Sequence, residues 1–246
     1  MSEIYYSDVY KQYIKSNNDY IFKTSILQNI IWEEEICNLI CQYIEPNTDF
    51  IDIGSNIGLI SLAVNLLLHN QNKAPNIHCF ECNPDTFMSL KYNTQDKSNI
   101  YLYNFGLSNK VQICNMNNNE YNNGCSHIHY VIDNEIKRDI SYTHTNIPEF
   151  KKNNNLFIAT LPLDSFLNCF TKRISVIKID VEGFEFFVLQ GAKNLIDSYK
   201  PIIFIEIFDE KLNEIIEWFN IRNYGLFKKM NVIDYLFVPK ERIISI

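Results

Sequence analysis

Phe50-Ile51-Asp52-Ile53-Gly54-Ser55-Asn56-Ile57-Gly58 is the stretch of the sequence that decides the fold. A run of β-branched and aromatic residues breaks into two glycines four positions apart, and an apolar stretch follows from Leu59 to Leu68. This order predicts a strand, a tight turn and a helix. Glycine lets the backbone approach a ligand closely, and the free N–H groups of the helix start are hydrogen-bond donors. We therefore predict that a nucleoside-bearing ligand binds over this turn.

The glycine spacing distinguishes between nucleotide ligands. A dinucleotide fingerprint requires G-x-G-x-x-G and a Walker loop requires G-x-x-x-x-G-K-[ST], whereas this turn reads D-x-G-x-x-x-G with no lysine behind it. A carboxylate at Asp52 repels phosphate but suits an ammonium, a sulfonium or a sugar hydroxyl, and S-adenosylmethionine carries all three. The spacing therefore disfavours a nicotinamide oxidoreductase. The alternative is an ordinary βα turn in which Asp52 only caps the helix.

Length and composition favour a single globular domain. The 246 residues suffice for one large α/β domain with a sizeable core. The net charge of −7 and the absence of a basic cluster argue against a nucleic-acid partner. The seven cysteines lack the spacing of a zinc site and are expected to be free thiols, as in a reducing cytosol. No signal peptide or membrane-spanning apolar run is visible, so we expect a cytoplasmic protein without a membrane partner.

The chain divides into an arm and one domain. Residues 1–25 are polar and tyrosine-rich, and they are predicted to form an N-terminal arm, a lid or a covering helix. Residues 26–246 are predicted to form a single domain, which begins with a helix from Ser25 to Ile44. An asparagine-rich insertion around residues 110–155 interrupts the regular pattern, and we expect it to be a substrate loop.

Acidic residues recur at the ends of the predicted strands. Glu81 follows Ile77–Phe80, Asp180 follows Val176–Ile179, and Glu206 ends a run that begins at Pro201. Ligands of open α/β sheets bind outside the carboxyl ends of the strands. We therefore expect these three acids to converge with Asp52 in one crevice.

Lys178 is an unusual residue for the buried strand that it occupies. Strand alternation places Lys178 and Asp180 on the same side, and two charges in a core are costly unless they are paired or used. A purely structural ion pair is the alternative interpretation. Glu182 and Glu185 flank Gly183 at a helix start, where a capping role is the alternative to a functional one.

Six segments of the chain resemble the FkbM family of S-adenosylmethionine-dependent methyltransferases. They are FIDIGSNIG (50–58), CFECNPDTF (79–87), NFGLSN (104–109), LPLDSF (161–166), VIKIDVEGFEFFVLQGAKNLI (176–196) and IFIEIF (203–208). The resemblance covers about residues 30 to 240. It implies a class I methyltransferase (Rossmann-like) fold, with a doubly wound, mostly parallel seven-stranded sheet and an antiparallel C-terminal hairpin. The chain departs from the family at Ser55, where alanine is common, and at Cys82, which lies beside the expected ribose-binding acid.

The resemblance also implies site residues. The turn would shape the methionine pocket, Glu81 would hold the ribose hydroxyls, and Asn104 or Gly106 would lie near the adenine. The cofactor-binding residues implied in this way are Asp52, Gly54, Ser55, Asn56, Gly58, Glu81, Asn83, Asn104 and Gly106.

The sequence and the resemblance together predict an O-methyltransferase that acts on a sugar, a nucleotide sugar or a glycan. Asp180 is the first candidate for the general base and Glu206 the second, while Lys178 would orient Asp180 and Glu182 would contact the acceptor or the helix start. Asp180 and Glu206 can also ligate a divalent cation such as Mg²⁺, but two carboxylates alone are a weak metal signal, and no metal ligands are predicted.

Other functions remain open from the sequence. The fold can serve as a non-catalytic nucleoside-binding or scaffold module. A protein or RNA-cap acceptor is a further alternative, disfavoured because the acidic chain lacks a basic groove. The acceptor's identity and a homo-oligomeric state are not determined by the sequence.

Overall fold

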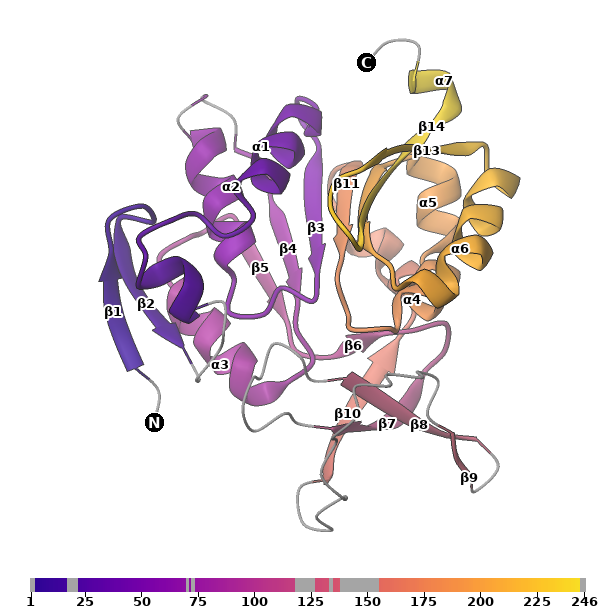
Figure 1. The fold of residues 1–246 in the computed structure, drawn as a ribbon, viewed down its shortest axis with the longest axis horizontal. Coiled ribbons are helices and arrows are strands. Elements are labelled where there is room, and N and C mark those ends of the chain that lie inside the picture. The colour runs from indigo at the N-terminus through magenta and orange to yellow at the C-terminus, as the bar shows by residue number, and fades with distance from the viewer. Residues whose placement is uncertain are drawn as a thin grey trace.

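The computed structural model describes residues 3–16, 22–69, 71, 74–117, 127–132, 135–137 and 155–243. Its main sheet has seven strands in the order β13-β14-β12-β11-β3-β4-β5 (Figure 1). The five strands from β12 to β5 are parallel, whereas β14 pairs antiparallel with both β12 and β13. The predicted doubly wound sheet with an antiparallel C-terminal hairpin is confirmed. The strands are β3 (Asp49–Ile53), β4 (Ile77–Phe80), β5 (Ile100–Tyr103), β11 (Ile174–Ile179), β12 (Ile202–Glu206), β13 (Tyr224–Lys229) and β14 (Asp234–Pro239).

Helices cover both faces of this sheet (Figure 1). Successive side chains of a strand point to opposite faces, so each central strand supplies two separate cores. Phe50, Val176 and Phe204 pack with α1 and α2, whereas Ile51 and Ile177 pack with α4, α5 and α6. The helices are α1 (Glu34–Tyr43), α2 (Leu59–His69), α3 (Pro84–Asn93), α4 (Glu185–Gly191), α5 (Lys193–Tyr199), α6 (Asp209–Ile221) and α7 (Lys240–Ile243), with the short turns η1 (Phe22–Ile26) and η3 (Leu163–Cys169).

A second sheet occupies part of the predicted insertion. Its strand order is β6-β10-β7-β8-β9, and it lies below the main sheet in Figure 1. Cys114, Met116 and Ile158 form a small core with Phe184, which precedes α4. The rest of the predicted insertion, residues 118–126, 133, 134 and 138–154, lies outside the described residues. The strands are β6 (Gly106–Leu107), β7 (Gln112–Asn117), β8 (His127–Ile132), β9 (Glu135–Lys137) and β10 (Asn155–Leu161).

The described part of the predicted N-terminal arm contains a β-hairpin and most of the short π-helix η1. Its strands are β1 (Glu3–Ser7) and β2 (Gln12–Ser16). The Asn93 side chain of α3 accepts a hydrogen bond from the backbone N–H of Lys15 at 2.7 Å and donates to the carbonyls of Lys15 and Ile57 at 3.0 and 2.8 Å. In the loop that joins the two strands, the hydroxyl of Tyr10 accepts a hydrogen bond from the backbone N–H of Trp32 at 3.2 Å. The hairpin is therefore fastened to the main domain at two points.

The predicted helix from Ser25 to Ile44 begins later than expected. The α-helix starts at Glu34, and Glu33 before it has φ 48° and ψ 47°, in the left-handed region. A residue in that conformation cannot continue a right-handed helix, so the chain turns at this point. The turn brings Glu33 toward the carboxyl edge of the sheet. None of the helices in the described ranges is long and apolar enough to cross a membrane.

Candidate functional site

A cavity of about 410 Å³ lies at the carboxyl ends of the parallel strands. It brings together the four strand-end acids that were expected to converge there, Asp52, Glu81, Asp180 and Glu206. The other predicted site residues that line it are Gly54, Ser55, Asn56, Gly106, Lys178 and Glu182. Gly58, Asn83 and Asn104 are not among the residues that line the cavity in the described part of the chain.

The turn after β3 is fixed by close backbone contacts. Gly54 has φ 78°, and a Cβ atom on it would lie 1.7 Å from the carbonyl oxygen of Asp180, so only glycine fits there. The backbone N–H groups of Gly54 and Ser55 both donate to the carbonyl of Phe80, at 2.9 and 3.0 Å. The turn is thus held between the ends of β4 and β11. This arrangement explains why the turn requires a glycine at position 54.

Glu81 has its carboxylate held by backbone donors. One oxygen accepts a hydrogen bond from the N–H of Asn56 at 3.0 Å, and the other accepts one from the N–H of Asn83 at 2.8 Å. The side-chain amide of Asn104 donates to the carbonyl of Glu81 at 2.9 Å. Asn83 and Asn104 therefore orient Glu81 without reaching the cavity themselves. The neighbouring wall is apolar, with Phe80, Phe105, Leu107 and Met116.

Asp52 is buried with one oxygen left without a hydrogen bond. The hydroxyl of Ser61 donates to Oδ2 at 2.5 Å, whereas Oδ1 has no hydrogen-bond partner among the described residues. The side chain is only 1% exposed. Burial raises the pKa of Asp52, although the nearby Lys178 ammonium opposes the shift. A buried polar oxygen without a partner is costly, so this oxygen is suited to a ligand.

Lys178 lies at the centre of the charged part of the cavity. It pairs in register with Asp52 on β3 and Phe204 on β12, and its ammonium donates to Asp180 Oδ2 at 2.8 Å. Burial alone would lower the pKa of Lys178, but the surrounding carboxylates of Asp180, Glu33 and Asp52 outweigh it and raise the pKa. Lys178 is therefore charged at neutral pH.

Asp180 and Glu206 form a hydrogen-bonded pair of carboxyl groups. Burial raises the pKa of Asp180, but the adjacent Lys178 ammonium and the hydrogen bond from Glu206 outweigh it, and the pKa is lowered overall. Burial and the charge of Asp180 raise the pKa of Glu206 to about 10. At neutral pH Asp180 is therefore ionised, and Glu206 is protonated and donates to it.

Glu182 and Glu185 lie in different surroundings, although the sequence suggested helix capping as the alternative role for both. Glu185 accepts hydrogen bonds from the backbone N–H groups of Val181 and Gly183, at 3.3 and 2.9 Å, and so holds the loop before α4. Burial raises the pKa of Glu185 to about 7. Glu182 has φ 54° and lines the cavity.

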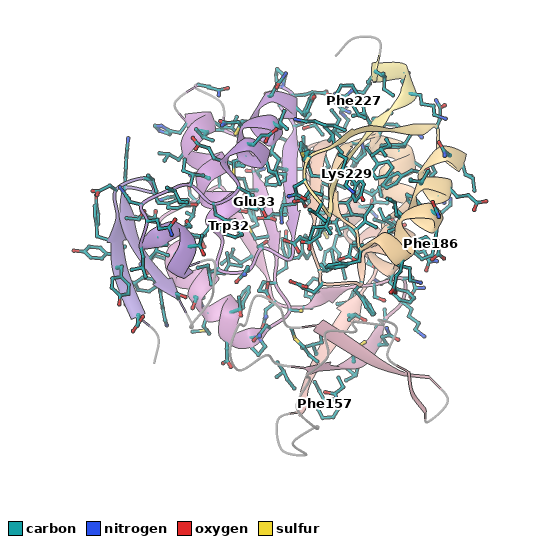
Figure 2. All side chains as sticks on the ribbon, viewed as in Figure 1. Trp32, Glu33, Phe157, Phe186, Phe227 and Lys229 are labelled. Carbon is teal, nitrogen blue, oxygen red and sulfur yellow. The ribbon has the colours of Figure 1, made fainter. Side chains whose placement is uncertain are left out.

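The sequence interpretation missed two cavity carboxylates and an aromatic residue. Trp32 and Glu33 reach the cavity from the segment before α1, where Figure 2 labels them. Asp234 starts the antiparallel strand β14 and pairs in register with Glu206. Its carboxylate accepts a hydrogen bond from the side-chain amide of Asn231. An antiparallel C-terminal hairpin was predicted, so the antiparallel pairing was the signal that could have placed Asp234 here.

The charge of the cavity is strongly unbalanced. Seven carboxyl groups line it, and Lys178 is the only lysine or arginine among the described lining residues. Within the described ranges, no group of three or more histidine, cysteine, aspartate or glutamate residues is arranged to hold a metal ion. A divalent cation is therefore not supported at Asp180 and Glu206, which bond to each other. The seven are Glu33, Asp52, Glu81, Asp180, Glu182, Glu206 and Asp234.

Comparison with known proteins gives one family match. A sequence model described as the methyltransferase FkbM domain matches residues 52–226. No curated protein matches the chain. The matched region contains both the glycine turn and the segment from Lys178 to Glu185, and it begins after the segment that carries Trp32 and Glu33.

Several solved structures are similar to the chain at low sequence identity. A methyltransferase FkbM from Methylobacillus flagellatus KT matches with a TM-score of 0.51 and 17% identity, over 79% of this chain and 44% of that protein. The chain thus spans less than half the length of that protein. A precorrin-6y C5,15-methyltransferase from Geobacter metallireducens GS-15 has a TM-score of 0.45, with 11% identity over 82% of this chain and 85% of that one. Fibrillarin from Aeropyrum pernix, with natively bound S-adenosyl-L-methionine, has a TM-score of 0.46, with 9% identity over 96% of this chain and 81% of that one.

Proposed function

Since the chain belongs to the FkbM methyltransferase domain family, we propose that it transfers the methyl group of S-adenosylmethionine to a hydroxyl of a sugar, a nucleotide sugar or a glycan. One observation carries this proposal. A single cavity connects the backbone-held carboxylate of Glu81 with the ionised Asp180 and the protonated Glu206. The first group suits a nucleoside, and the other two suit a hydroxyl that must lose a proton.

The residues of the cavity fit S-adenosylmethionine. The carboxylate of Glu81 keeps acceptor capacity for ribose hydroxyls, because each of its oxygens has more than one lone pair. The apolar wall that contains Phe105 suits the faces of a purine, and the buried Oδ1 of Asp52 suits a hydroxyl or a cationic group. When bound, this cofactor supplies a methyl carbon that is activated by a sulfonium.

Asp180, Glu206 and Lys178 would hold the acceptor hydroxyl and take its proton. Asp180 is a weak base, but the hydroxyl proton becomes strongly acidic as the oxygen bonds to carbon, so a nearby carboxylate is sufficient. Lys178 fixes one oxygen of Asp180, and Glu206 donates a hydrogen bond to the same carboxyl group. Alignment of the reacting atoms can contribute about 7–11 kcal/mol, and general base catalysis adds about 10²–10⁴-fold.

The charge of the cavity restricts the part of the acceptor that enters it. The ionised members of its seven carboxyl groups outnumber the single ammonium, and they oppose the entry of a phosphate or carboxylate group of the acceptor. A neutral, hydroxyl-bearing portion fits this environment, because carboxylates accept hydrogen bonds from hydroxyls. If the acceptor is a nucleotide sugar, we expect its diphosphate to remain outside the cavity.

Calorimetric titration with S-adenosylmethionine, S-adenosylhomocysteine and NAD tests the cofactor assignment. We expect the first two to bind and NAD not to bind. Glu81→Gln removes a charged hydrogen-bond acceptor and should weaken binding of S-adenosylmethionine by about 10- to 100-fold. Glu217→Gln, at an exposed position of α6, is the matched control and should bind as the wild type does. Failure of the wild type to bind either compound would refute the proposed function.

Transfer of an isotope-labelled methyl group to a panel of sugars, nucleotide sugars and glycans tests the reaction. With a working acceptor, Asp180→Asn should lower turnover by about 10²–10⁴-fold. Full turnover by both Asp180→Asn and Glu206→Gln would show that neither carboxyl group is catalytic. Tight cofactor binding with no transfer to any class of acceptor would instead favour the non-catalytic binding module.

A further inference from the structure

We propose that Glu33, together with Asp52, recognises the positive charge of the sulfonium, so that the protein holds the methyl donor more tightly than its neutral thioether product. This inference rests on the proposed function, because it concerns the same cavity. It assigns a role to a residue that precedes the family match, which begins at residue 52.

The position of Glu33 in the fold brings it to the charged part of the cavity. The strand residues Asp52, Lys178 and Glu206 share the side of the sheet that faces α1, and Glu33 immediately precedes α1. Its carboxylate interacts electrostatically with Lys178, Asp180, Asp234 and Asp52. Glu33 is therefore next to the groups that would hold the acceptor hydroxyl, which is where a transferable methyl group must point.

Glu33 and Asp52 each have an unused oxygen. Glu33 Oε2 and Asp52 Oδ1 are inaccessible to solvent and have no hydrogen-bond partner among the described residues. Asp52 is 99% buried and lines the cavity. The single ammonium of Lys178 donates to Asp180, and no hydrogen bond from it to the other two carboxyl groups is present. A cationic ligand would complete the local charge balance.

Trp32 adds a second feature that suits a cation. It lines the cavity directly before Glu33, and Figure 2 labels both side chains at the segment that precedes α1. The face of an indole ring attracts cations, and sites for permanently charged groups often combine aromatic rings with carboxylates. A neutral thioether gains little from either feature. The charged form of the ligand is therefore the one that this wall favours.

The test compares three ligands that differ in the charged groups they carry. S-adenosylmethionine carries an ammonium, a carboxylate and a sulfonium, S-adenosylhomocysteine carries the ammonium and the carboxylate without the sulfonium, and 5′-methylthioadenosine carries none of the three. Dissociation constants are measured calorimetrically at pH 8 for the wild type, Glu33→Gln and Glu34→Gln. Glu34 is an exposed neighbour and provides the matched control. Circular dichroism of each variant checks that the fold is retained.

We expect Glu33→Gln to lower the affinity ratio of S-adenosylmethionine to S-adenosylhomocysteine by about tenfold, which is about 1.4 kcal/mol. Glu34→Gln should leave the ratio unchanged, and Glu33→Asp should retain part of the preference because it keeps the charge. Equal weakening of both compounds in Glu33→Gln would overturn the inference, because Glu33 would then bind the shared ammonium. Equal weakening of all three compounds, or no change, would overturn it as well. Absence of binding to the wild type would refute the proposed function, and the inference with it.

Discussion

The two ends of the cavity are built in opposite ways. At one end, the carboxylate of Glu81 accepts hydrogen bonds from two backbone N–H groups and lies beside apolar side chains. At the other end, Lys178 is surrounded by several carboxyl groups. Asp180 and Glu206 bond to each other, whereas Asp52 and Glu33 each keep an oxygen that has no hydrogen-bond partner in the described part of the chain.

Under the proposed function, the Glu81 end would bind the nucleoside and the Lys178 end would take part in the reaction. Backbone donors are fixed by the fold, so the Glu81 end is organised before any ligand arrives. At the Lys178 end, the pKa values of Glu33 and Glu206 are raised and that of Asp180 is lowered, because the charges there are buried and close together. We therefore expect substitutions at the Lys178 end to affect stability strongly, and in a manner that depends on pH.

The largest effect is expected from Lys178→Met. Removal of the ammonium leaves the carboxylates of Asp180, Asp52 and Glu33 buried without compensation, and the free energy of unfolding should fall by about 3–5 kcal/mol at pH 7.5. The loss should be smaller at pH 5, where the carboxyl groups take up protons. Urea unfolding at both pH values measures this. Lys193→Met, which breaks an exposed ion pair with Asp197, is the control and should cost no more than about 1 kcal/mol. An equal loss at both pH values would contradict the electrostatic explanation.

A smaller effect of opposite sign is expected from Glu33→Gln. Burial raises the pKa of Glu33 to about 7, despite the opposing charge of Lys178. A raised pKa in the folded state means that the protonated form stabilises the fold, and this contribution is complete below the ordinary pKa of about 4.5 and is lost as the pH rises through 7. The glutamine variant is always neutral. It should therefore match the wild type near pH 4.5 and exceed its stability by about 1–3 kcal/mol at pH 8.

Urea unfolding of the wild type and Glu33→Gln at pH 5, 6, 7 and 8 measures this difference in the free energy of unfolding. The other ionisable groups that face Glu33 are present in both proteins. Their own titration therefore largely cancels in the stability difference between the wild type and Glu33→Gln. They are Lys178 and Asp180 from β11 and the loop after it, Asp52 from β3, Asp234 from β14, Cys37 from α1, and Tyr10 from the hairpin. A stability difference that is constant from pH 5 to pH 8 would show that Glu33 does not titrate in this window.

The smallest effect is expected from Glu206→Gln. Burial and the charge of Asp180 raise the pKa of Glu206 to about 10, so at pH 7 this side chain is already neutral and donates a hydrogen bond to Asp180. Glutamine is also neutral and can donate the same bond. The free energy of unfolding at pH 7 should therefore change by less than about 1 kcal/mol. A loss of several kcal/mol would contradict this interpretation, because a neutral amide should replace a protonated carboxyl group at little cost.

The sequence predicted the acids at the ends of the parallel strands better than the other carboxyl groups of the cavity, for a physical reason. Asp52, Glu81, Asp180 and Glu206 each lie at the carboxyl end of a parallel strand, and such strands are visible as apolar runs. Their shared edge follows from the topology of doubly wound sheets. The convergence of these residues could therefore be inferred without coordinates.

Glu33 and Asp234 could not be found in the same way. Asp234 reaches the cavity because β14 is antiparallel, so the start of the strand, not its end, lies beside Glu206. Glu33 lies in a turn with positive φ. The apolar periodicity of the helix that follows gives no indication of this turn. Such residues join a site through long-range packing, which leaves no regular spacing in the sequence.

The N-terminal hairpin is hydrogen-bonded to residues at the cavity, so its amide groups can report on ligand binding from a distance. None of its described residues lines the cavity, yet the amide N–H of Lys15 binds the Asn93 side chain that also holds Ile57, and Tyr10 holds the amide N–H of Trp32. A ligand that reduces the motion of the turn or of Trp32 would also slow the exchange of the Lys15 and Trp32 amide hydrogens with solvent. We therefore expect hydrogen exchange at Lys15, which does not line the cavity, to follow occupancy of the site.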